Sequence, residues 1–169
     1  MRKSLNLALA AALLLTGACA RREQAVEAPP PAPAATAGTA EDDVELVELP
    51  ALQADLVAKA GSDTIYFATD KSDVELSGQR TLAAQAKWML ANPTVRASIE
   101  GHCDERGTRE YNMALGERRA NAARDYLVSQ GVPAARLLVT SWGKEKPVAT
   151  GSDENAWAQN RRAVTVVVK

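Results

Sequence analysis

The stretch "EGHCDERGT", Glu100–Thr108, decides the fold because it joins a predicted strand to a predicted helix. Upstream, apolar and polar residues alternate over Val95–Glu100, which is typical of a strand with one buried face. Downstream, helical spacing of apolar residues runs over Tyr111–Gln130, and Thr108 is a residue type that caps helix N-termini. The sequence therefore predicts a strand, a polar connection and a long helix.

Further elements are predicted on both sides of this unit. A β-branched and aromatic run indicates a strand over Thr64–Ala68, and apolar spacing indicates a helix over Leu76–Ala91 that Asn92-Pro93 ends. Three later elements are predicted: a strand over Leu137–Ser141, a short helix over Ser152–Gln159 and a buried strand over Ala163–Val168. The order βαβαββ predicts an α+β fold with one mixed four-stranded sheet and helices packed on it.

The first residues have the pattern of a secretion signal. Two basic residues precede the apolar run "LNLALAAALLL", Leu5–Leu15, which is shorter than the roughly 20 residues of a membrane-spanning helix. The following "TGAC", Thr16–Cys19, resembles a bacterial lipobox and implies cleavage before Cys19 and lipid on that residue. We therefore expect a lipoprotein signal peptide over residues 1–18. A plain signal peptide with an incidental cysteine is the alternative.

A long segment rich in Pro and Ala follows the cysteine. We expect residues 19–60 to form a lipid-anchored, disordered linker and residues 61–169 to form the folded domain. Leu49–Ala60 is open to two interpretations, a short helix or more tether. A tether of about 40 residues spans roughly 35 Å as a coil and up to about 130 Å when taut. Such a tether suits a domain that binds something away from its membrane.

Composition and motifs exclude several function classes. The 20 basic and 21 acidic side chains are nearly balanced, so charge gives no reason to expect a nucleic acid. Zinc needs three or four ligands, whereas the one histidine, His102, adjoins Cys103 and would point to the opposite face of a strand. A Cys–His nucleophilic pair meets from distant segments, and no nucleophile elbow or phosphate loop occurs. We expect no metal, no cofactor and no enzymatic activity.

The long helix places an arginine on its buried side. At 100° per residue, Tyr111, Leu115 and Ala122 define an apolar arc, and Arg119 falls inside it. A buried arginine needs an anion beside it, and Asp104 follows the strand that should pack against this helix. We therefore expect Asp104 and Arg119 to pair. The pair is either a structural ion pair or part of a pocket for a zwitterionic ligand with a free amino-acid end.

Four stretches in order, "YFATDKSDV", "EGHCDERGTREYNMALGERRANAARDYL", "SWGKEKP" and "NRRAV", resemble the OmpA C-terminal domain family as found in peptidoglycan-associated lipoproteins. The resemblance covers roughly residues 65–168. It implies non-covalent binding of the meso-diaminopimelate of peptidoglycan stem peptides. The family's ligand-binding residues correspond to Asp70, Asp104, Asn112, Leu115 and Arg119.

The same resemblance implies a location and partners. The expected location is the periplasmic face of the outer membrane, and Ala20 after the cysteine, in place of Asp, favours that membrane. The expected partners are peptidoglycan, the membrane through lipid on Cys19, and TolB with other proteins of the Tol–Pal cell-division and envelope system. Glu105, Arg106 and Gly143–Pro147 are candidates for the TolB surface. The alternative function is a periplasmic protein-interaction module of the same fold without direct wall binding.

Overall fold

A computed structural model describes the backbone of residues 40–169 and the side chains of residues 49–169. The expected signal peptide, Cys19 and the first part of the linker lie outside the described residues, so those predictions stay predictions. Among the described helices, none combines the length and apolar character needed to cross a membrane.

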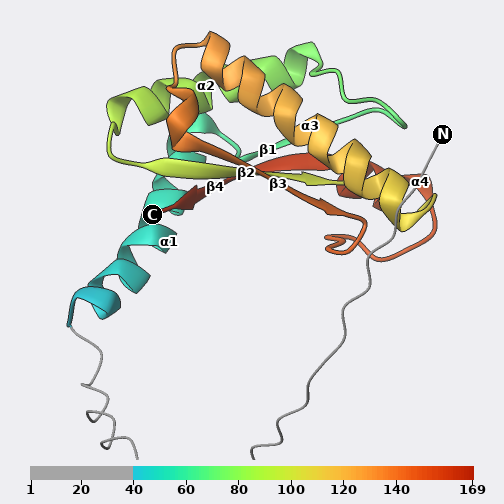
Figure 1. Cartoon of the computed structure of the whole chain (residues 1–169), viewed down its shortest axis with the longest axis horizontal. Coiled ribbons are helices and arrows are strands. Elements are labelled where there is room, and N and C mark those ends of the chain that lie inside the picture. Colours follow the sequence, from blue (N-terminus) through green and yellow to red (C-terminus); the bar gives the residue numbers. More distant parts are fainter. Residues whose placement is uncertain (1–39) are drawn as a thin grey trace, which may run out of the picture. The chain divides into compact units, whose positions relative to one another are not determined.

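The described residues form one mixed four-stranded sheet with helices, as predicted (Figure 1). The strand order is β1-β4-β2-β3, in which β2 and β3 are parallel and the other neighbours antiparallel. Helices α2 and α3 lie together over one face of the sheet (Figure 1). The elements in chain order are α1 (Ala40–Ala60), β1 (Thr64–Tyr66), α2 (Leu76–Ala91), β2 (Arg96–His102), α3 (Arg109–Ser129), a 3₁₀ turn (Ala134–Arg136), β3 (Leu137–Gly143), α4 (Glu154–Asn160) and β4 (Arg162–Val168).

All four strands differ in bounds from the prediction. Strand β1 ends at Tyr66 and not at Ala68, although the Phe67 amide still donates to the Arg161 carbonyl at 2.9 Å. Strand β2 begins at Arg96 and continues to His102 with a register shift after Gly101, β3 continues to Gly143, and β4 begins at Arg162. Strands β1 and β2 end at the same end of the sheet, where the polar connection to α3 begins.

Two glycines let α3 lie unusually close to the sheet. A Cβ atom built on Gly101 in β2 would lie 1.9 Å from the carbonyl oxygen of Gly116 in α3. Small alanines fill the same layer, and Ala97, Ala120 and Ala123 are all at most 1% exposed. This close packing holds the first half of α3 directly over the carboxyl end of β2.

Helix α1 corrects the predicted boundary at residue 61. The linker was expected to run through residue 60, but α1 packs against α2 and β4, and Leu56 is fully buried in the core. Strand β1 pairs with only three β4 residues and leaves β4 backbone groups uncovered. The Gln53 side chain covers them: its Nε2 donates to the Thr165 carbonyl at 3.0 Å, and its Oε1 accepts from the Val167 amide at 2.8 Å. Of the two interpretations of this segment, the helix is correct.

Candidate functional site

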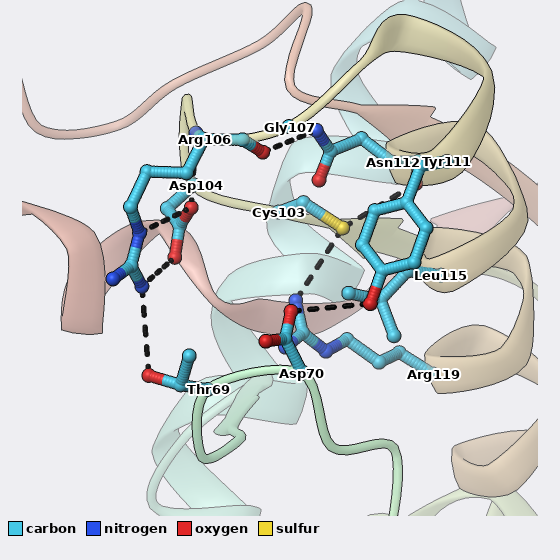
Figure 2. A pocket seen from close by; sticks show the side chains of 10 residues that line it. All are labelled: Thr69, Asp70, Cys103, Asp104, Arg106, Gly107, Tyr111, Asn112, Leu115 and Arg119. Carbon is cyan, nitrogen blue, oxygen red and sulfur yellow. Dashed lines mark hydrogen bonds and ion pairs between the residues drawn. The ribbon is translucent and has the colours of Figure 1, made fainter.

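A pocket of about 310 Å³ opens at the carboxyl end of β2 (Figure 2). Three segments build it: the loop after β1, the connection from β2 to α3, and the first half of α3. All five predicted site residues line it, although they come from positions up to 49 residues apart in the chain. The lining residues are Thr69, Asp70, Cys103, Asp104, Arg106, Gly107, Tyr111, Asn112, Leu115 and Arg119.

Arg119 is 1% exposed and is held by backbone acceptors. Its guanidinium donates to the carbonyls of Lys71 at 2.9 Å, His102 at 2.9 Å and Ala68 at 3.1 Å, and to the Cys103 sulfur at 3.4 Å. These bonds tie α3 to the loop after β1 and to the end of β2. They therefore shape the pocket as well as placing a cation in its wall.

The predicted pair between Asp104 and Arg119 is wrong. No carboxylate of the described residues lies within 4.0 Å of the Arg119 guanidinium, because strand-end carbonyls take its hydrogen bonds. Burial lowers the pKa of Arg119, but an arginine keeps its proton in proteins. The pocket wall therefore carries a desolvated positive charge that no adjacent carboxylate neutralises, which favours an anionic group of a ligand.

Asp104 pairs with two other arginines. Its carboxylate lies 2.6 Å from Arg106 Nη2 and 3.5 Å from Arg161 Nη1. Burial raises the pKa of Asp104, but hydrogen bonds and charge from Arg106, helped by the charge of Arg161, outweigh it and leave the pKa below its ordinary value. Asp104 is therefore a buried carboxylate that stays ionised near neutral pH.

Asp70 closes the pocket from the loop after β1. It has φ of 57°, in the left-handed region that residues other than glycine seldom adopt. Its Oδ1 accepts from the Tyr111 hydroxyl at 3.1 Å, and this hydrogen bond raises the pKa of Tyr111. Figure 2 shows Asp70, Tyr111 and Arg119 on one side of the pocket and Asp104 with Arg106 on the other. A strained acid in a pocket wall is typical of a binding site.

Asn112 and Leu115 have different roles in the pocket. Asn112 Nδ2 donates to the Arg106 carbonyl at 2.7 Å and the Thr108 carbonyl at 3.0 Å, so it organises the loop. Leu115 is 3% exposed and supplies an apolar wall. Asn112 is therefore in the pocket mainly as a positioning residue.

Sequence reasoning missed Tyr111 and Arg161 and assigned Arg106 only to a partner surface. The helical wheel counted Tyr111 only as a residue of the apolar arc, and nothing in the sequence indicated that its hydroxyl faces a pocket. Arg161 is 6% exposed, and its Nε donates to the Phe67 carbonyl at 3.1 Å. Because 57 residues separate it from Asp104, only the fold brings the two together.

The pocket is lined by several kinds of polar group. They are two arginines, two carboxylates, two hydroxyls, one amide and the Cys103 thiol, whose pKa burial raises. The described part of the chain holds no group of three or more His, Cys, Asp or Glu side chains placed to bind a metal. A carboxylate beside a separate unpaired cation suits a ligand with both an ammonium and a carboxylate group.

Comparison with known proteins gives consistent similarities. A model of the OmpA family matches residues 66–161. The peptidoglycan-associated lipoprotein of Agrobacterium fabrum is 53% identical over 118 residues, which cover 70% of this chain and 66% of that protein. The protein of the same name from Pseudomonas aeruginosa is 59% identical over 99 residues, covering 59% of this chain and 58% of that protein.

A solved structure agrees with the sequence similarities. The peptidoglycan-associated lipoprotein from Burkholderia pseudomallei superposes with a TM-score of 0.62 at 44% identity, covering 64% of this chain and 92% of that one. The matched part of this chain spans less than two thirds of the length of either relative, 66% of the Agrobacterium protein and 58% of the Pseudomonas protein. With its family model over more than half of its length and its sheet and helices in the family arrangement, this chain belongs to the OmpA family.

Proposed function

We propose that this protein is an outer-membrane lipoprotein whose folded domain binds peptidoglycan non-covalently. Lipid on Cys19 anchors the chain at the periplasmic face, and the Pro/Ala-rich segment spans the distance to the wall. In this proposal the protein belongs to the Tol–Pal system, with TolB as a partner. The relatives from Agrobacterium and Burkholderia are named peptidoglycan-associated lipoproteins, which supports the lipoprotein and peptidoglycan-binding parts of this proposal.

The ligand is the meso-diaminopimelate of a stem peptide, whose side chain ends in an ammonium and a carboxylate. The observation that carries this assignment is the Arg119 charge, buried in the pocket wall with no carboxylate of the described residues in contact. The ligand's carboxylate compensates that charge, and its ammonium turns toward Asp104 on the other side of the pocket. No covalent step is needed, because charge complementarity and fit supply the affinity.

Co-sedimentation with purified sacculi tests the assignment. The purified chain in detergent is mixed with sacculi rich in diaminopimelate, and the bound fraction is compared for wild type, Asp104→Ala and Arg119→Lys. Loss of one charge-assisted contact should weaken binding about tenfold or more. Lysine keeps the charge of Arg119 but not its set of hydrogen bonds, and melting curves verify that each variant is folded. Arg118→Lys, on an exposed neighbour in α3, should bind like wild type.

The alternative is a protein-interaction module with no direct wall binding. The two arginines beside Asp104 favour this alternative, because they already neutralise the carboxylate that the proposal gives to the ligand's ammonium. If wild type fails to sediment with sacculi, this alternative replaces the proposal. If wild type and both pocket variants sediment equally, the chain binds the wall through another surface.

A further inference from the structure

The carboxylate of Asp104 has one buried and one partly exposed partner. The side chain of Arg161 is 7% exposed and is also held by Glu154 Oε1 at 2.6 Å, so it has little freedom. The side chain of Arg106 is 39% exposed at the pocket mouth, with Nη2 at 2.6 Å and Nε at 3.1 Å from the Asp104 carboxylate. Figure 2 shows this side chain curling back over Asp104. Arg106 therefore stands where a ligand's ammonium would bind.

The backbone of this loop is held by contacts that do not involve the Arg106 guanidinium. The Arg106 amide donates to Asp104 Oδ1 at 3.1 Å, and the Arg106 carbonyl accepts from Asn112 at 2.7 Å. Lys144 Nζ donates to the carbonyls of Glu105 at 3.1 Å and Gly107 at 2.7 Å. Because four backbone contacts fix the loop, the guanidinium can leave Asp104 without the loop losing its conformation.

The Arg106 guanidinium has a further partner besides Asp104. It lies 4.1 Å from the centroid of the Trp157 ring, and Trp157 Nε1 donates to Glu105 Oε1 at 3.1 Å, which fixes the ring. A cation over a tryptophan face is stabilised by that ring, independently of any contact with Asp104. Arg106 can therefore give up Asp104 while keeping its contact with Trp157.

We propose that Arg106 is an internal competitor for the ligand's ammonium and so determines which ligands the pocket accepts. This inference rests on the proposed function. A ligand ammonium beside Asp104 would make a third cation around one carboxylate unless Arg106 leaves. An anion without an ammonium does not displace Arg106, and an amine without a carboxylate leaves Arg119 uncompensated. A ligand with both groups satisfies the whole pocket.

The test is calorimetric titration of the purified chain with the tripeptide L-Ala-D-Glu-meso-diaminopimelate. A second ligand is the same tripeptide acetylated on its free side-chain amine. Arg106→Gln removes the competing charge and leaves a shorter, neutral polar side chain, so we expect it to bind the tripeptide roughly two- to fivefold more tightly than wild type. Binding of the acetylated ligand should not change, because that ligand has no ammonium to place beside Asp104.

Arg109→Gln is the matched control. It removes the same charge three residues away, from a side chain that is 65% exposed and bonded to Glu145 at 3.1 Å, and its affinity should equal that of wild type. Melting curves verify folding. Weaker binding by Arg106→Gln would mean that Arg106 is itself a ligand contact, and equal binding would mean that it does not compete; either result overturns the inference. If Arg106→Gln binds the tripeptide and wild type does not, the inference holds. If neither wild type nor Arg106→Gln binds the tripeptide, both the inference and the proposed function fail.

Discussion

His102 shows how one buried side chain makes stability depend on pH. It ends β2 at 3% exposure, and its Nδ1 is buried without a hydrogen-bond partner. Burial, together with the positive charges of Arg162 and Lys146, lowers the pKa of His102 from 6.5 to about 4. A hydrogen bond with the Lys146 backbone opposes this pKa shift but does not cancel it. The imidazole is therefore neutral at pH values near 7.

This lowered pKa predicts a loss of stability in acid. Between pH 6.5 and 4 the unfolded chain binds a proton at His102 and the folded chain does not, so the free energy of unfolding falls as pH falls through this window. A shift of this size corresponds to roughly 3 kcal/mol. Urea unfolding at pH 7 and pH 4 should show wild type losing about that much more than His102→Gln. Equal losses would show that other groups cause the acid sensitivity; His102 is the chain's only histidine.

The pairing of α3 with β2 is the element that places the pocket. Gly101 and Gly116 meet backbone to backbone, and Arg119 reaches the His102 carbonyl at the end of β2 only because α3 lies this close. A Cβ atom at Gly101 would meet a carbonyl oxygen at 1.9 Å, and a main-chain atom cannot rotate away as a side chain can. The helix would have to lift from the sheet.

Gly101→Ala is therefore expected to destabilise the fold by more than about 3 kcal/mol, measured by thermal or urea unfolding. Gly131→Ala is the control, because a Cβ atom there meets nothing within 4 Å. The free energy of unfolding of that variant should fall by only the strain of an alanine at φ of 97°, about 1–2 kcal/mol. Similar losses in the two variants would mean that α3 and β2 adjust easily, contrary to this account.

Periodicity identified the helices because α2 and α3 each bury one face, and Thr108 signals the start of α3, where its hydroxyl accepts from the Tyr111 amide at 3.2 Å. The prediction that β2 buries only one face is wrong, because Ser98 is 7% exposed on the face opposite Ala97 and Ile99. The helical wheel also placed Arg119 on the buried side. It could not identify the partners of Arg119, because backbone carbonyls carry no sequence signal. The docking of α1 was equally hidden, since Gln53 reads as an ordinary polar residue of a helix.

At the scale of the whole molecule, α1 and the pocket lie at opposite ends of the sheet. Gln53 binds Thr165 and Val167 of β4, and Val167 pairs with Ala97 near the start of β2, whereas the pocket begins after β2 ends. Six residues of strand, about 20 Å, separate the two. In the proposed tether, tension from the membrane anchor enters the domain at α1 and is resisted at the bound ligand, so it must pass through the paired strands of the sheet before it acts on the pocket.

This geometry predicts that loosening α1 leaves ligand binding intact. Gln53→Met keeps the side-chain length but removes its bonds to Thr165 and Val167, which should cost about 1–2 kcal/mol and raise hydrogen exchange at the Val167 amide. Lys59→Met, on a side chain that is 69% exposed in the same helix, should change neither. Affinity for the diaminopimelate tripeptide should stay within about twofold of wild type in both, because the intervening strands remain paired. A parallel loss of Val167 protection and tripeptide affinity would instead show that α1 and the pocket are coupled through the sheet, and that tension on the anchor also loosens the ligand.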